Sequence, residues 1–285
     1  MSPTKARSVL ITGCSSGIGL CVAEGLKARG YRVFATARKD ADVERLNDDG
    51  FESLKLDLRD SASISAAFDE VLERTGNRLY GLFNNGGYGQ PGAVEDLTME
   101  ALRAQFETNF FGWHALTRRA LPVMRACGEG RIIQNSSVLG FITLKYRGAY
   151  NASKFAVEGL SDTLRLELAG TNIHVCLIEP GPIISRFREN AYRAFNANID
   201  VEGSFHRESY QALEQRLADS VHEPPFTLPA SAVLKKVVHA LESKRPRPRY
   251  YVTVPTYGFG VLKRLLPTRL LDRLLIAASG AETRH

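Results

Sequence analysis

Short apolar runs alternate with segments of helical spacing over the first 180 residues, and this alternation limits the folds open to the chain. The run Ser8–Ile11 closes at Thr12 and Gly13, and residues 18–29 then repeat apolar side chains at helical intervals. Such pairs are typical of buried parallel strands, each followed by an amphipathic helix. The pattern predicts an α/β fold built on a doubly wound parallel sheet, with helices on both faces and right-handed crossovers.

Further strands and helices are predicted along the chain in the same order. After residue 182 the alternation stops, and residues 183–229 are polar and helix-leaning. These residues predict a helical substrate lid, and residues 256–285 a helical tail, within one domain of residues 1–285. The remaining predicted strands are 32–37, 54–58, 81–84, 131–135, 173–178 and 250–254, and the remaining predicted helices are 61–74, 98–111, 112–127 and 150–168.

Composition argues against several classes of function. The formal net charge is +6, with much of the excess late in the chain, but no nucleic-acid recognition motif accompanies it. The four cysteines stand in no CxxC or CxH pattern, which argues against metal ligation and fits a reducing compartment. Neither an apolar leader nor a run of 18 apolar residues is present, so the sequence predicts a cytoplasmic protein.

A segment rich in glycine and serine, residues 12–19, follows the first predicted strand. Glycines let the backbone turn sharply and approach a ligand, and the following helix offers its first N–H groups to a pyrophosphate. An ordinary glycine–serine loop is the alternative, but the position directly after the first strand favours a dinucleotide. The predicted cofactor contacts are Gly13, Ser15, Ser16, Gly17, Ile18 and Gly19.

The residue after the second predicted strand indicates which dinucleotide is bound. NAD-selective sites usually place a carboxylate there, whereas this chain has Arg38. A guanidinium can stack on adenine and hold a 2′-phosphate, so Arg38 favours NADP(H) over NAD(H). A solvated loop arginine is the alternative.

The ends of the third and fourth predicted strands supply further candidate contacts. Asp57, beside Leu58, can accept a hydrogen bond from the adenine amino group or equally act as a helix N-cap. Asn84 and Gly86 close the fourth strand near the same crevice, where Asn85 can instead tie strands together.

Tyr150 and Lys154 lie four residues apart, so a helix places them on one face. Ser137 follows the fifth predicted strand, so the three side chains can meet at the carboxyl edge of the sheet. A tyrosine has a reference pKa of about 10 and needs help to act near neutral pH. We expect Lys154 to lower the Tyr150 pKa and hold the nicotinamide ribose. We expect Tyr150 to move the substrate proton and Ser137 to hold the substrate oxygen.

Taken together, these motifs resemble the short-chain dehydrogenase/reductase family, and the likeness covers residues 9–254. The family implies a Rossmann-type fold and a nicotinamide cofactor. It also implies that Asn109 holds a water molecule that links Lys154 to solvent as a proton relay. The nicotinamide is expected to be bordered by Pro180, Gly181 and Ile183.

Two details of the resemblance concern single positions. Ser137 has the spacing to Tyr150 that the family shows, which makes Ser136 the second choice. Gly86 stands where the family usually has alanine, which puts the rigidity of that loop in question.

The predicted lid is rich in aromatic side chains, which suggests a hydrophobic substrate similar to those of the steroid and retinol branch of the family. Packing of the lid onto the body explains each of these aromatics equally well. They are Phe187, Tyr192, Phe195, Phe205 and Tyr210, joined by Phe141, Leu144 and Tyr146 ahead of the catalytic tyrosine.

Residues 259–278 mix leucines with Lys263, Arg264, Arg269 and Arg273. A basic amphipathic helix of this kind can lie on an anionic membrane surface, pack in an oligomer or cover the substrate pocket.

The leading prediction is an NADP(H)-dependent oxidoreductase that interconverts a hydrophobic primary or secondary alcohol and its carbonyl, and that forms a homo-oligomer. The alternative is a non-catalytic dinucleotide-binding regulatory protein, although such a protein would be expected to lack Tyr150 or Lys154. An epimerase or dehydratase is a weaker hypothesis, because the short loop after Gly87 argues against a sugar-nucleotide substrate.

Overall fold

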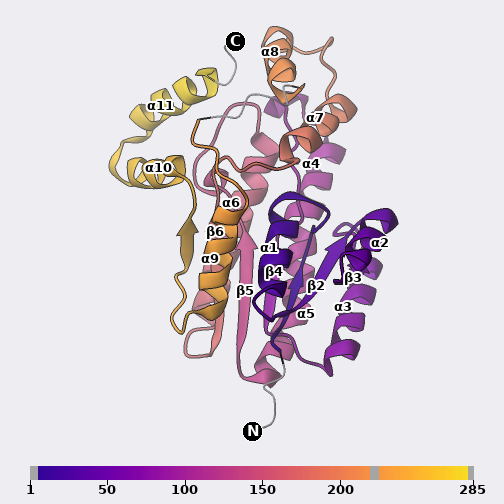
Figure 1. Ribbon diagram of the computed structural model, residues 1–285. Coiled ribbons are helices and arrows are strands. Elements are labelled where there is room, and N and C mark those ends of the chain that lie inside the picture. The colour runs from indigo at the N-terminus through magenta and orange to yellow at the C-terminus, as the bar shows by residue number, and fades with distance from the viewer. Residues whose placement is uncertain (1–5, 219–224, 282–285) are drawn as a thin grey trace.

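A sheet of seven parallel strands, in the order β3-β2-β1-β4-β5-β6-β7, forms the centre of the molecule (Figure 1). The computed structural model describes residues 6–218 and 225–281, so residues 219–224 of the predicted lid and 282–285 of the predicted tail lie outside it. The predicted doubly wound fold is confirmed. The strands are β1 Ser8–Ile11, β2 Arg32–Ala37, β3 Glu52–Lys55, β4 Gly81–Asn84, β5 Gly130–Asn135, β6 Ile173–Glu179 and β7 Arg249–Tyr251.

Helices cover both faces of the sheet because successive strand side chains point to opposite faces. In β1, Val9 and Ile11 pack into one core with Val22, whereas Leu10 packs into the other with Trp113. The first face carries α1 Gly17–Lys27, α2 Asp40–Asp48 and α9 Ser231–Glu242, and the second carries α3 Ser61–Thr75, α5 Gly112–Cys127 and α6 Gly148–Glu167.

Two helical segments precede α5 without a break. They are α4 Met99–Phe106 and a π-helical turn, Glu107–Phe111, which carries Asn109. The widened turn closes with a hydrogen bond from the Gly112 N–H to the Glu107 carbonyl oxygen. Such turns recur at functional sites because they shift one side chain out of the regular helical register.

Some predicted boundaries were wrong. Residues 54–58 were predicted as the third strand, but pairing with β2 ends at Lys55, and Leu56 and Leu58 are buried beyond the ladder. The last strand was predicted to reach residue 254, but Val254 begins a helix, with a proline in its first turn. Helices α2 and α9 were missed.

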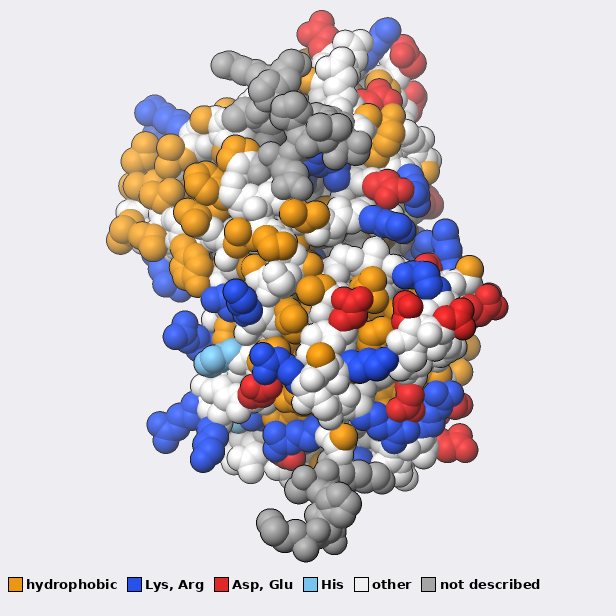
Figure 2. Space-filling view, viewed as in Figure 1, with side chains coloured by type: hydrophobic (Ala, Val, Ile, Leu, Met, Phe, Trp, Pro, Cys, Tyr) orange, Lys and Arg blue, Asp and Glu red, His pale blue; other side chains and the backbone are white. Residues whose placement is uncertain are grey.

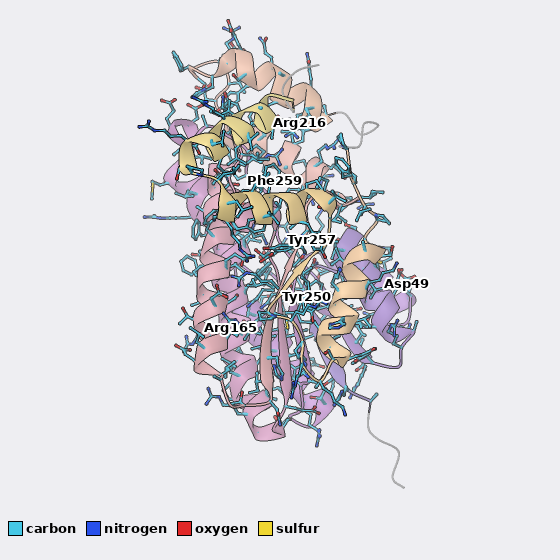
Figure 3. All side chains as sticks on the ribbon, turned by 90° about the vertical axis from the view of Figure 1, so that its left-hand side faces the viewer. Asp49, Arg165, Arg216, Tyr250, Tyr257 and Phe259 are labelled. Atoms are coloured by element: carbon cyan, nitrogen blue, oxygen red, sulfur yellow. The ribbon has the colours of Figure 1, made fainter. Side chains whose placement is uncertain are left out.

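The lid and the tail each pack on the body through a small apolar cluster. The lid helices are α7 Phe187–Asn198 and α8 Arg207–Ala218, packed around Phe195 and Tyr210. The tail is two helices, α10 Val254–Leu265 and α11 Thr268–Ala281, separated at Leu266 and Pro267. Figure 3 looks onto this side, where Tyr250 of β7 lies below Tyr257 and Phe259 of α10. None of the described helices is both long and apolar enough to cross a membrane.

Candidate active site at the carboxyl edge of the sheet

The loops that follow β1 and β4 touch backbone to backbone. The Thr12 hydroxyl accepts hydrogen bonds from the backbone N–H groups of Asn85 and Gly86, each at 2.9 Å. Gly13 has a φ of 72°, and a Cβ atom there would lie 2.6 Å from the Gly86 Cα. No larger residue fits at Gly13 without moving the neighbouring loop. Leu58 borders the same contact, because a Cβ atom added to Gly86 would lie 3.0 Å from the Leu58 Cδ1.

The N-terminus of α1 opens beside this contact. Ser16 is the N-cap residue, but its side chain makes no capping hydrogen bond. Gly17, with a φ of 58°, lies close to Ser185, so the segment after β6 returns over the glycine loop. Uncapped N–H groups, a partial positive charge and a backbone without side chains are what a pyrophosphate needs. The loop therefore fits a dinucleotide.

Asn85 ties three strand ends together. Its Nδ2 donates to the carbonyl oxygens of Thr12 at 2.9 Å and Gly13 at 3.2 Å, and its Oδ1 accepts from Asn135 Nδ2 at 2.9 Å. Asn85 therefore ties strands together, which was the alternative role predicted for it.

Asn84 turns to the opposite side of the same strand. Its side chain is fully buried and donates to Gln134 Oε1 at 3.0 Å and to the Thr117 hydroxyl at 3.2 Å. The prediction that Asn84 contributes a cofactor contact is therefore wrong for its side chain, because adjacent strand residues face opposite layers.

The sheet edge beside the end of β2 is cationic. Arg38 is exposed directly after β2. Burial raises the pKa of the Tyr88 phenol, although the positive charges of Arg59 and Arg38 lower it. Asp57 Oδ1 accepts from the Arg59 N–H at 3.0 Å, whereas the cap of α3 is Asp60. The N-cap alternative for Asp57 is therefore wrong.

Ser137 and Tyr150 meet where β5 and β6 end. The Ser137 hydroxyl accepts from the Leu139 N–H at 3.1 Å, and a hydrogen bond joins it to the Tyr150 hydroxyl. The Val138 N–H donates to the Pro180 carbonyl oxygen at 2.8 Å, which joins the two strand ends. This backbone link fixes the loop that carries Ser137.

Lys154 lies deep below Tyr150. Its Nζ donates to the Asn135 carbonyl oxygen at 2.7 Å and lies 4.2 Å from the centre of the Trp113 ring. Burial lowers the pKa of Lys154 to about 7, although the nearby Glu158 carboxylate raises it. Burial also raises the pKa of Tyr150 to about 12, against the hydrogen bond from Ser137 and the charge of Arg147. The lowered Tyr150 pKa expected from Lys154 is therefore not produced by the protein's own groups, because desolvation outweighs them.

Comparison with known proteins decides the family. The family model described as short chain dehydrogenase matches residues 7–194. The chain belongs to the short-chain dehydrogenase/reductase family. It is 46% identical over 274 residues to an Escherichia coli K12 protein named "Uncharacterized oxidoreductase YbbO", covering 94% of each chain. It is 33% identical to an NADPH-dependent 3-dehydrocapnine reductase of Ornithobacterium rhinotracheale, covering 94% of this chain and 95% of that one. A solved short-chain dehydrogenase of Streptomyces avermitilis, 29% identical, superposes with a TM-score of 0.76 and covers 92% of this chain and 94% of that one.

Asn109, predicted as the fourth catalytic member of this short-chain dehydrogenase, is completely buried in the π-helical turn. Its Nδ2 donates to the Tyr88 carbonyl oxygen at 2.8 Å, and its Oδ1 accepts from the Tyr88 N–H at 3.1 Å. The side chain therefore fixes the loop after β4, and its part in a proton relay stays a prediction.

A buried carboxyl pair lies one helical turn beyond Lys154. Arg249 Nη2 donates to Glu158 at 3.1 Å and to Asp162 at 2.6 Å, and its Nε lies 3.1 Å from Glu179. Burial raises the pKa of both Glu158 and Glu179, although the charge of Arg249 lowers both. The negative charge of Glu158 raises the pKa of Glu179 further, because two adjacent buried carboxylates repel each other.

Among the described lid residues, Phe187 is the aromatic whose ring packs against Tyr150, with 5.3 Å between the ring centres. Phe195 and Tyr210 are buried in the cluster at the lid helices, which agrees with the alternative that the lid aromatics serve packing. Phe205 is almost fully exposed. Tyr146 also packs on Tyr210. Phe141 and Leu144 pack in the same apolar cluster as Tyr150, and Phe141 also stacks on Tyr251. Tyr192 instead bonds Glu214 within the lid.

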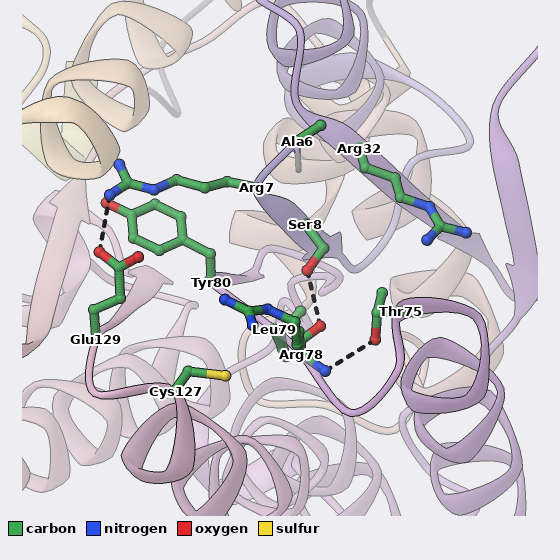
Figure 4. Close-up of a pocket in the computed structure, with 10 residues that line it drawn as sticks. All are labelled: Ala6, Arg7, Ser8, Arg32, Thr75, Arg78, Leu79, Tyr80, Cys127 and Glu129. Carbon is green, nitrogen blue, oxygen red and sulfur yellow. Dashed lines mark hydrogen bonds and ion pairs between the residues drawn. The ribbon is translucent and has the colours of Figure 1, made fainter. Parts of the chain in front are cut away.

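A separate hollow of about 150 Å³ lies at the opposite, amino edge of the sheet (Figure 4). Its lining includes Arg7 and Tyr80, and Arg7 is paired with Glu129 at 2.9 Å. Tyr80 precedes β4, whereas Ser137 follows β5, so the hollow is remote from the catalytic set. Among the described residues, no group of His, Cys, Asp and Glu side chains is arranged to hold a metal ion.

Proposed function

We propose that the protein is an NADP(H)-dependent oxidoreductase that interconverts an apolar alcohol and its carbonyl compound by hydride transfer. One observation carries the proposal: Ser137 bonds Tyr150 above a buried Lys154, at the same sheet edge as the loop that fits a dinucleotide. A purely regulatory binding protein has no use for this buried, costly arrangement of titratable groups.

The cofactor would be held by the N–H groups at the start of α1 and by Arg38. When bound, the nicotinamide supplies or accepts the hydride. Arg38 stands after β2 where NAD-selective sites carry a carboxylate, and its exposed guanidinium can hold a 2′-phosphate. Support for NADP(H) also comes from the related reductase, which is named as NADPH-dependent.

Tyr150 would give the proton in the direction of carbonyl reduction. Since burial raises its pKa to about 12, the phenol stays protonated at neutral pH and can donate to the substrate oxygen. The Ser137 hydroxyl can donate a hydrogen bond to the same oxygen as it gains negative charge. Lys154, with a pKa of about 7, can take up or release a proton beneath the tyrosine.

The surroundings of Tyr150 suit an apolar substrate. The ring belongs to an apolar cluster with Phe259 and Leu271, and Phe187 covers it from the lid. A carbonyl on a hydrocarbon chain or ring would bury its apolar part here, while Ser137 and Tyr150 meet its oxygen.

The test is NADPH oxidation by the purified protein with short aliphatic, long-chain, retinoid and steroid carbonyls, with NADH as the parallel cofactor. We expect turnover with NADPH that rises with the apolar size of the substrate. NADPH binding without oxidation across the whole panel would contradict the enzymatic proposal and favour the regulatory alternative. Preference for NADH would contradict the role of Arg38.

A further inference from the structure

Helix α10 carries an apolar stripe on its outer side. Val254, Tyr257, Val261 and Leu265 follow each other at intervals of three and four residues, so they share one face. All four are exposed, Val254 by 65% and Leu265 by 74%. An ordinary surface helix turns its apolar stripe to the core and its polar side to water, which is the reverse of this arrangement.

Helix α11 extends the apolar surface. Leu270, Leu274 and Ile276 are exposed on it, and only two residues separate it from α10. Figure 2 shows hydrophobic side chains gathered over the part of the molecule where Figure 1 places α10 and α11. The docking surface, as we call it, consists of the exposed apolar side chains Val254, Tyr257, Val261 and Leu265 of α10 and Leu270 and Leu274 of α11.

The inner side of the same two helices is already packed. Leu275 lies in a buried cluster with Leu139 and Ile142, and partly buried Phe259 and Tyr150 pack against that cluster. The docking surface is therefore not needed to attach the helices to the body. It lies on the outside of the helices whose inside borders the proposed catalytic tyrosine.

The charges around the docking surface are mostly positive. Helices α10 and α11 carry four cationic side chains, Lys263, Arg264, Arg269 and Arg273, and one carboxylate, Asp272. Arg264, Arg269 and Arg273 are exposed, and within residues 6–218 and 225–281 none of them forms an ion pair. Exposed apolar side chains flanked by unpaired cations complement an anionic lipid surface, where each cation adds to the attraction.

We propose that α10 and α11 dock the protein on the surface of an anionic lipid bilayer, with the docking surface in the interfacial region. The proposal deepens the proposed function and rests on it in one respect, because an apolar substrate dissolved in the bilayer would then lie beside the site. A second copy of the chain is a poorer occupant. A two-fold contact through these helices would bring the unpaired arginines of both copies together.

Flotation of the full-length chain with vesicles tests the docking surface. We expect the protein to bind phosphatidylcholine vesicles that contain phosphatidylglycerol, to bind pure phosphatidylcholine vesicles more weakly, and to lose the difference in high salt. Leu265→Glu should weaken vesicle binding about tenfold or more, because a carboxylate replaces an apolar side chain that would lie among the lipids. Leu166→Glu is the matched control, because Leu166 is 66% exposed on α6, away from these helices, and should leave binding unchanged.

A second pair of variants separates the charges from the apolar contact. Arg269→Gln and Arg273→Gln should each reduce binding to the anionic vesicles about fivefold, and should leave binding to phosphatidylcholine unchanged. Equal losses on both kinds of vesicle would contradict the electrostatic part of the proposal.

Three results would overturn the proposal. One is a wild-type chain that binds neither kind of vesicle, and another is equal binding by Leu265→Glu and the wild type. The third is light scattering that shows Leu265→Glu turning a dimer into a monomer without any vesicle binding, since the surface would then join two copies. Failure of the proposed function looks different: vesicles bind, but no carbonyl is reduced by any variant.

Activity assays complete the design. Leu265→Glu should reduce a short water-soluble ketone at the wild-type rate, and should reduce a long-chain ketone supplied in vesicles at least several-fold more slowly. Loss of both activities would instead indicate damage to the site.

Discussion

The sheet edge and its helical cover are built on different physical principles. At the edge, the polar side chains of Thr12 and Asn85 bond to backbone atoms of neighbouring strand ends, and Lys154 bonds to the Asn135 carbonyl oxygen. The cover packs on the body through two small apolar clusters, while apolar side chains such as Leu265 remain in solvent. A rigid edge suits chemistry that needs fixed distances, and a cover held by apolar contacts can change its lining without disturbing the bonds at the edge.

This comparison teaches where changes should act. Substitutions at the edge should alter the chemical step, cofactor choice or stability, whereas substitutions in the cover should alter which substrate binds. Each of the following substitutions acts on one of the two regions.

Tyr150→Phe should lower kcat by about 1000-fold, because the proton donor to the substrate oxygen is lost. The NADPH dissociation constant should change little, since the ring remains. Steady-state turnover and fluorescence titration with NADPH measure the two quantities. Turnover within tenfold of the wild type would show that another group supplies the proton.

Arg38→Asp should reduce kcat/KM for NADPH about 100-fold and leave NADH less affected, because charge-assisted hydrogen bonds to the 2′-phosphate are replaced by repulsion. Kinetics with both cofactors measure the change. Arg245→Asp makes the same charge change at an exposed turn before β7 and should have no effect on either cofactor. If Arg38→Asp and Arg245→Asp give the same kcat/KM for NADPH, Arg38 does not bind the 2′-phosphate.

Lys154→Met should stabilise the fold while it removes activity. The Lys154 pKa is about 7 in the folded chain and about 10.4 when unfolded, so the unfolded chain binds more protons between these values. Wild-type stability should thus rise with pH across that window. We expect the variant to be more stable by about 1–3 kcal/mol at pH 6 and the gap to shrink toward pH 10. Thermal unfolding across this range measures it, and a gap independent of pH would contradict a buried, titrating Lys154.

Phe187→Ala should raise KM for apolar carbonyls about tenfold with a small change in kcat, because the ring covers Tyr150 but holds no reacting atom. Phe205→Ala is the matched control, as this lid residue is 92% exposed. Equal effects of the two substitutions on KM would indicate a general loosening of the lid instead of a contact with substrate.

The sequence predicts the edge better than the cover, for a physical reason. Tyr150, Lys154 and the glycine loop follow strand ends, and parallel strands bring their carboxyl ends to one edge whatever the loops do. Helix α2 was missed because it buries only Leu46, which leaves almost no helical periodicity to detect.

Other errors came from long-range contacts. Asn84 bonds Gln134 of another strand, which no local pattern reveals. The pKa of Lys154 depends on the depth of its burial beside Trp113. The roles of the lid aromatics depend on which of them pack in the buried cluster with Phe195 and Tyr210.

The most direct measurement follows the hydride itself. NADPH that carries deuterium at its hydride-donating carbon is incubated with the protein and a long-chain ketone, and the alcohol formed is analysed by mass spectrometry. The account predicts one deuterium in the alcohol with the wild type, and almost no alcohol with Tyr150→Phe. Alcohol formed without deuterium from fully labelled cofactor, or no alcohol from any carbonyl tested, would contradict it.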